Sequence, residues 1–150
     1  MPVRSVIVPM WRFVLSEGLD ILTNAEMLEH QKTLLACPRF DTAFNRLYNV
    51  STLSDFQVSP SQMRAMPYPY AAGAIRAIVA ENDMIYGMAR MYQMLRDEEH
   101  QGALHVCRRL EEALEWIGLP RRDYDWVSSK LSDVEAGELL VVEGRPPGGP

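Results

Sequence analysis

The first sixteen residues combine two short apolar runs with a proline. Residues 3–8 (VRSVIV) and 11–16 (WRFVLS) are rich in β-branched and aromatic side chains, and Pro9 lies between them. This composition is typical of extended backbone. We therefore predict either the two strands of a hairpin or one bent strand.

The spacing of apolar residues becomes helical over residues 24–36. Thr23 or Asn24 can cap this helix with its side-chain oxygen, and Glu26 is placed to complete a capping box with Thr23. We expect the helix to end at Cys37, because the residue before a proline avoids α-helical backbone angles.

The two spacings alternate along the chain as far as residue 117. Strands are predicted at 46–53, 74–80 and 103–107, and helices at 60–66, 83–96 and 109–117. This order predicts an α/β fold with one small, mostly parallel sheet of four to five strands flanked by helices.

The apolar content becomes patchy beyond Pro120, and the chain ends in RPPGGP. Such a segment offers few residues for a packed core. We therefore predict a domain over residues 1–120 and a C-terminal appendage over 121–150, with its last residues disordered.

The most regular apolar stripe lies on the predicted helix 83–96. Its residues recur at i, i+4, i+7 and i+11, which predicts that the stripe docks on the sheet. The stripe consists of Met84, Met88, Met91 and Leu95, and Ile85, Ala89 and Tyr92 lie alongside it. Gly87 lies inside the same helix, where glycine costs about 1 kcal/mol relative to alanine. We expect a tight backbone contact at Gly87 to account for it.

The opposite edge of this helix supplies candidate binding residues. Tyr86 and Arg90 are i, i+4 neighbours, and Arg76 on the preceding strand is a second candidate cation. These side chains suit an anionic or polar ligand. The alternative is an internal network of arginine with Asp83 or Asp97 that ties the helix to a loop.

The composition argues against several classes of function. The chain has 150 residues, of which 47% are apolar, and a formal net charge of −5. This suits a single domain that lacks the basic surface required for nucleic acid binding. No apolar run approaches the roughly 20 residues that cross a bilayer, and the N-terminus does not resemble a signal peptide. Two distant cysteines are typical of reduced thiols in a cytoplasmic protein.

Candidate chemistry is sparse. The three histidines show no metal-ligand spacing with Cys37 or Cys107, so we predict neither a metal nor a cofactor. His105 and Cys107 have the residue types of a base and a nucleophile, but no third group activates them and we expect a structural role. On the last helix, Arg108 and Glu112 at i, i+4 indicate a solvated ion-pair face. Because no motif of an established catalytic site is present, we predict that the chain is not an enzyme.

Four segments carry a resemblance to a known family. They are LTNAEMLEHQKTLLACPRFD, LYNVSTLSDFQVS, RAIVAENDMIYGMARMYQML and RRLEEALEWIGL. In this order and spacing, residues 3 to 119 resemble the SpoIIAA-like (STAS/SEC14-type) domains of bacteria, and within them an uncharacterised branch. The resemblance implies a small parallel or mixed sheet flanked by helices, and it implies little about activity.

The resemblance also raises the question of a phosphorylation site. In this family, antagonists of anti-sigma factors carry a phosphorylated serine just after an aspartate at a helix start. Those two positions are Val58 and Gln57 here, and Ser59 follows one place later, before Pro60. A phosphate on Ser59 would be stabilised by the helix N-terminus. Capping alone accounts for a serine before a proline, so we expect Ser59 to be an N-cap.

Two functions remain open. The resemblance implies a non-enzymatic regulatory or protein-interaction module, as a monomer or homodimer. The alternative is a carrier or sensor of a small hydrophobic or anionic ligand, with a pocket lined by methionines and by aromatic residues such as Tyr68 and Tyr70. A large closed apolar cavity would favour the carrier, and a packed core with an exposed apolar patch would favour the module.

Overall fold

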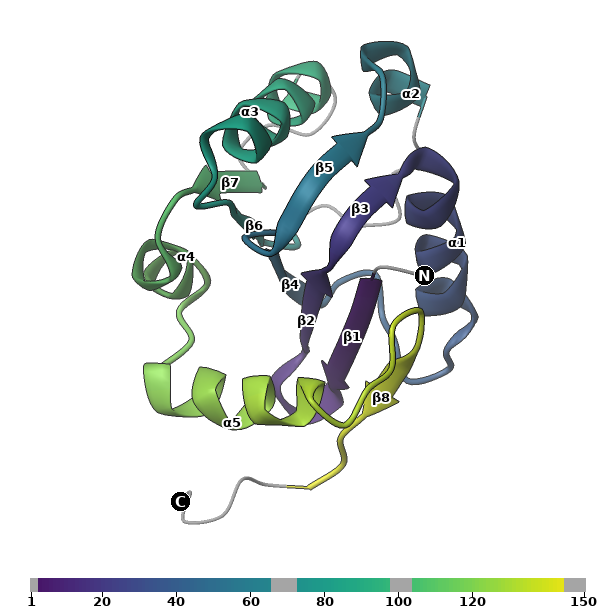
Figure 1. The fold of residues 1–150 in the computed structure, drawn as a ribbon. Helices are drawn as coiled ribbons and strands as arrows, with labels where there is room; N and C mark the ends of the chain where they lie inside the picture. The colour runs from purple at the N-terminus through teal and green to yellow at the C-terminus, as the bar shows by residue number, and fades with distance from the viewer. Residues whose placement is uncertain (1–2, 66–72, 98–103, 145–150) are drawn as a thin grey trace.

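The computed structural model describes residues 3–65, 73–97 and 104–144. The main sheet has six strands in the order β7-β6-β4-β2-β1-β8 (Figure 1). Its strands are β1 (Val3–Val8), β2 (Phe13–Gly18), β4 (Asn45–Asn49), β6 (Arg76–Val79), β7 (Leu104–Cys107) and β8 (Leu139–Val141). Only β1 and β2 pair antiparallel, and the other pairs are parallel. The predicted α/β class with a mostly parallel sheet is confirmed, whereas the predicted strand number of four to five is too low.

Helices cover both faces of this sheet (Figure 1). They are α1 (Asn24–Ala36), α2 (Pro60–Ala65), α3 (Asp83–Asp97), α4 (Leu110–Ile117) and α5 (Arg121–Leu131). One face packs against α4 and α5, where Leu15 and Leu47 meet Ala113 and Val127. The other face packs against α1, α3 and a second parallel sheet formed by β3 (Asp20–Thr23) and β5 (Leu53–Gln57).

Local signals account for the N-terminal elements. The short 3-10 helix η1 (Pro9–Trp11) and Arg12, at φ 51°, reverse the chain, so the two predicted strands form a hairpin rather than one bent strand. Thr23 is the N-cap of α1, and its side chain exchanges hydrogen bonds with Glu26 as in a capping box. The helix spans the predicted residues 24–36, and Cys37 after it has extended backbone angles.

The predicted strand 46–53 is wrong, because the chain turns within it. It divides into the end of β4 and the start of β5, which belong to different sheets. The amide of Ser51 donates to the side-chain oxygen of Asn49 at 3.0 Å, which is typical of a turn closed by asparagine. Leu47, Val50 and Leu53 do not alternate as in a strand because this turn separates them.

The C-terminal region is not an appendage, which corrects the predicted boundary at residue 120. Tyr124, Val127 and Leu131 of α5 are buried in the same core cluster as the strands of the main sheet. Strand β8 extends the sheet by pairing with β1. The apolar residues of α5 recur at i, i+3 and i+7. In the sequence, so short a repeat is hard to distinguish from a segment of patchy apolar content. Residues 145–150, where we predicted disorder, lie outside the described residues.

Helix α3 is rotated relative to the predicted docking face. Its buried residues are Ile85, Ala89 and Tyr92, whereas Met84 is 49% exposed. The other three residues of the predicted stripe are half-buried. No other described part of the chain lies within 4 Å of the place that a Cβ on Gly87 would take, so the predicted tight backbone contact is not found there.

We expect Leu131→Ala to lower the free energy of unfolding by about 2–5 kcal/mol, because it leaves a cavity in the core shared by α5 and the sheet. Chemical denaturation would measure this. Leu35→Ala is the matched control, since Leu35 is a helical leucine that is 50% exposed, and it should change stability by about 0.5 kcal/mol or less. Equal effects of the two variants would mean that α5 does not belong to the core.

We expect Gly87→Ala to raise the free energy of unfolding by about 0.5–1 kcal/mol, because a helical alanine loses less backbone entropy and open space surrounds the added methyl group. Gly118→Ala should instead lower it by about 1 kcal/mol or more, since Gly118 ends α4 at φ 81°. Melting temperatures of the two variants would show opposite shifts. A drop for Gly87→Ala would indicate a contact at this position after all.

Candidate functional site

A cavity of about 80 Å³ lies on the face of the main sheet that carries α1 and α3. Its walls come from β4, β6 and β7, from the β3–β5 sheet, and from the inner faces of the two helices. The lining residues are Leu22, Met27, His30, Gln31, Arg46, Tyr48, Val50, Leu53, Phe56, Arg76, Ala77, Ile78, Ile85, Ala89, Tyr92 and Leu104. Most of these are apolar, and none of these described lining residues is acidic.

A chain of hydrogen bonds runs along one side of the cavity. Arg46 Nε donates to Ser16 Oγ at 3.0 Å, the hydroxyls of Ser16 and Ser5 lie 2.7 Å apart, and Ser5 Oγ lies 2.7 Å from His30 Nε2. All four side chains are buried, with at most 5% exposure. The register of the hairpin sets Ser5 opposite Ser16. We call this the Arg46–His30 chain.

One arrangement of protons along the Arg46–His30 chain uses both hydroxyl protons within it. Arginine only donates, so Ser16 accepts from Arg46. Both hydroxyl protons are used within the chain when Ser16 donates to Ser5 and Ser5 donates to His30 Nε2. The ring proton of neutral His30 then lies on Nδ1, which is buried and has no hydrogen-bond partner among the described residues. A buried donor of this kind is costly unless something accepts from it.

Two guanidinium groups line the cavity. Arg46 and Arg76 are neighbours across β4 and β6, and both are buried, with exposures of 5% and 7%. Arg46 also lies 4.8 Å from the centre of the Tyr48 ring. Burial and then the charge of Arg46 lower the pKa of His30 to about 3, so His30 is neutral at pH 7. The cavity therefore combines cationic and donor groups with apolar walls.

The structure does not bring the three predicted binding residues into one site. Arg76 lines the cavity. Arg90 lies exposed on α3 and donates a hydrogen bond to Gln93. Tyr86 is half-buried, and the guanidinium of Arg108 lies 4.3 Å from the centre of its ring. As for the alternative network, Asp83 pairs with Arg108.

Ser59 lies at the start of α2. The amide of Gln62 donates to Ser59 Oγ at 3.2 Å, and the Ser59 amide donates to the Gln62 side chain at 2.9 Å. These bonds are typical of a capping box. Phosphorylation of Ser59 stays a prediction.

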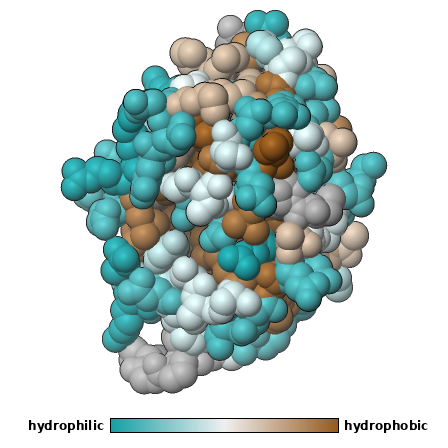
Figure 2. All heavy atoms as spheres, in the orientation of Figure 1, coloured by the Kyte–Doolittle hydropathy of each residue, from teal (hydrophilic) through white to brown (hydrophobic). Residues whose placement is uncertain are grey.

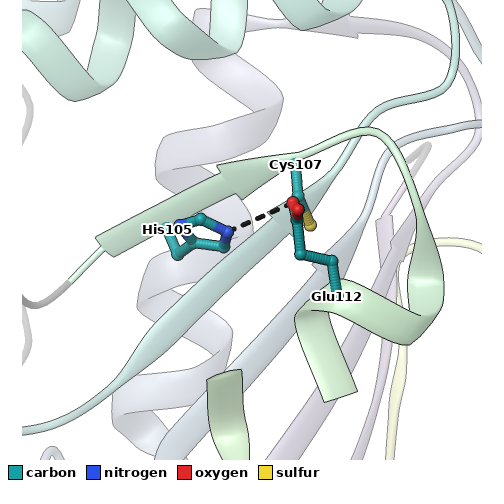
Figure 3. A group of neighbouring side chains, drawn as sticks. All are labelled: His105, Cys107 and Glu112. Carbon is teal, nitrogen blue, oxygen red and sulfur yellow. Dashed lines mark hydrogen bonds and ion pairs between the residues drawn. The ribbon is translucent and has the colours of Figure 1, made fainter. Parts of the chain in front are cut away.

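A second group of side chains lies on the other face of the sheet. His105 and Cys107 of β7 and Glu112 of α4 place their ligand atoms within 4.8 Å of one another (Figure 3). His105 Nε2 lies 3.3 Å from Glu112 Oε2. Burial and then the charge of Glu112 raise the pKa of Cys107 to about 11. The thiol is therefore protonated at neutral pH, which argues against a nucleophile.

Sequence reasoning missed all four residues of the Arg46–His30 chain. Ser5, Ser16 and Arg46 occupy inward positions of β1, β2 and β4, and His30 lies on the inner face of α1. Polar residues at inward positions were the available signal. Tyr68 and Tyr70, which we expected to line a pocket, lie outside the described residues.

The sequence matches no family model and no curated protein sequence. The SpoIIAA-like resemblance therefore stays a prediction. Within residues 3–65, 73–97 and 104–144, no helix is both long enough and apolar enough to cross a membrane.

We expect stability to fall as the pH is lowered from about 6.5, because unfolded His30 gains a proton that the folded chain does not take up until about pH 3. The free energy of unfolding should fall by up to about 1.4 kcal/mol per pH unit in this window. Denaturant titrations between pH 7 and about pH 5 would measure the slope above the range in which carboxylates titrate.

His30→Gln should flatten this slope, whereas His105→Gln, at the partly exposed histidine of β7, should retain it. An unchanged slope in His30→Gln would show that His30 is not the group responsible.

Proposed function

We propose that this chain is a non-enzymatic, ligand-binding module of the SpoIIAA-like (STAS/SEC14-type) class that senses or carries a small organic anion. The observation that carries the proposal is the buried, unpartnered Nδ1 of His30 in a cavity that Arg46 and Arg76 also line. An α/β fold with a mostly parallel sheet between helices agrees with the class.

The chemistry of the walls points to a carboxylate head and an apolar body. A carboxylate accepts hydrogen bonds from both an imidazole N–H and guanidinium groups, and such bonds are stronger than those between neutral groups. Leu53, Phe56 and Ile85 offer apolar contacts for the rest of the ligand. About 80 Å³ corresponds to roughly two to three water volumes. A short aliphatic monocarboxylate, such as acetate or propanoate, therefore fits best.

The cavity residues suit binding better than catalysis. A general acid or base works best with a pKa near the operating pH, and the pKa of His30 is lowered to about 3. Arginine keeps its proton at any physiological pH. These groups can hold and neutralise an anion, but they exchange no proton with it at pH 7.

A protein-interaction role would be favoured by one broad apolar patch. The large exposed hydrophobic residues of the described chain come from five elements: Met10, Ile21, Leu35, Met84, Met94 and Trp116. Figure 2 shows hydrophobic residues at separate places among polar ones on the face that it presents. This distribution favours the ligand over a docked partner as the primary function.

We expect propanoate to bind the purified protein and propanamide, which lacks the charge, to bind much more weakly. Isothermal titration calorimetry would measure both, with inorganic phosphate as a third probe. Arg76→Gln should weaken propanoate binding by about tenfold or more, because it removes a charge-assisted contact.

Arg90→Gln is the matched control, since Arg90 lies exposed on α3 outside the cavity, and its affinity should equal that of the wild type. Equal affinities for propanoate and propanamide would contradict an anion site. Native mass spectrometry of freshly purified protein would identify a ligand carried from the cell.

A further inference from the structure

The group of His105, Cys107 and Glu112 lies on the opposite side of the sheet from the cavity. His105 and Cys107 are two residues apart on β7, so both side chains face α4. Only two residues separate the end of β7 at Cys107 from the start of α4 at Leu110. This short connection holds the first turn of α4, with Glu112, close to the strand (Figure 3).

We infer that these three residues bind one Zn²⁺ ion, through His105 Nε2, Cys107 Sγ and a carboxylate oxygen of Glu112, with water as the fourth ligand. Imidazole nitrogen, thiolate sulfur and carboxylate oxygen are the ligand atoms that zinc takes in proteins. A thiolate disfavours Mg²⁺ and Ca²⁺, which prefer oxygen alone.

The distances are close to those that zinc requires. With bonds of about 2.0–2.3 Å, tetrahedral ligand atoms lie roughly 3.3–3.8 Å apart. His105 Nε2 and Glu112 Oε2 are already 3.3 Å apart, and the three ligand atoms lie within 4.8 Å of one another. The Glu112 side chain is 58% exposed, so it can adjust its position at little cost.

Two of the three ligands are held in place by their neighbours. The ring of His105 lies 5.2 Å from the ring of Trp116, centre to centre. The Cys107 thiol is directed at backbone oxygens of Ile78 and Arg109, at 3.7 and 3.5 Å. A site with fixed ligands on a strand loses little entropy when an ion binds.

Glu112 lies at a helix position where a glutamate side chain commonly accepts a hydrogen bond from the N-cap residue of its own helix. It is the third residue of α4, as Glu26 is of α1, and Glu26 completes a capping box with Thr23. The N-cap of α4 is Arg109, which makes no side-chain capping bond. The Glu112 carboxylate instead turns toward His105.

Binding involves no oxidation or reduction. The Cys107 S–H bond breaks as the sulfur–zinc bond forms, and the proton leaves to solvent. One thiolate and one carboxylate then balance the two positive charges of the ion. The site is independent of the proposed anion cavity, because none of its residues lines that cavity.

The test is a Co²⁺ titration of the reduced, metal-free protein, with Co²⁺ as a spectroscopic substitute for Zn²⁺. We expect a near-ultraviolet sulfur-to-cobalt charge-transfer band, the visible absorption of tetrahedral cobalt, and loss of both when one equivalent of Zn²⁺ is added. Cys107→Ser should abolish the charge-transfer band. Cys37→Ser should retain it, since Cys37 lies outside the group.

Glu112→Gln provides a test that leaves the buried thiol intact. Zn²⁺ affinity should fall by about tenfold or more, because losing a residue that only hydrogen-bonds to a metal ligand already costs that much. Glu111→Gln, on the same helix but paired with Arg121 at 3.2 Å, should bind like the wild type. The inference is wrong if the wild type shows no charge-transfer band or if the band persists in Cys107→Ser. If Cys107→Ser does not fold, unchanged Zn²⁺ affinity in Glu112→Gln overturns it.

Discussion

The Arg46–His30 chain is the constraint on which one half of this structure depends. Burying polar groups is costly unless each finds a partner, and here four buried side chains from β1, β2, β4 and α1 are linked in sequence by hydrogen bonds. A change of one residue in strand register would turn Ser5 or Ser16 to the opposite face. The chain of bonds therefore specifies the pairing of the hairpin and the position of α1 above it.

The same constraint creates the cavity. Arg46 and His30 form hydrogen bonds within the chain, and both side chains also line the cavity, whose walls are mostly apolar. Close packing normally fills such a space. An amphipathic anion matches a charged wall next to apolar walls better than a further hydrophobic residue does. The walls of the cavity therefore support the proposed ligand.

Strand β7 shows how one short element serves two environments. Leu104 and Val106 pack against α3 on the cavity side, whereas His105 and Cys107 face α4. Because strand side chains alternate, four residues supply both a core contact and two candidate metal ligands. The two proposed sites are thus separated by the thickness of the sheet, and each can be altered without removing residues of the other.

The sequence by itself determined the elements whose signals lie within a few residues. The capping box at Thr23, the N-cap at Ser59, the stop at Cys37 and the two N-terminal strands depend on neighbours in the chain, so they could be predicted along with the α/β class. Tertiary structure decided what depends on distant neighbours. Packing determined which face of α3 is buried, because the predicted stripe and the residues alongside it are both apolar enough to dock on the sheet. Strand β8 belongs to the sheet because it pairs with β1, and the order of the strands places Arg76 beside Arg46. Of the predicted binding residues, only Arg76 lines the cavity, because alternation in a strand fixes its face while the rotation of a helix is set by everything that packs against it.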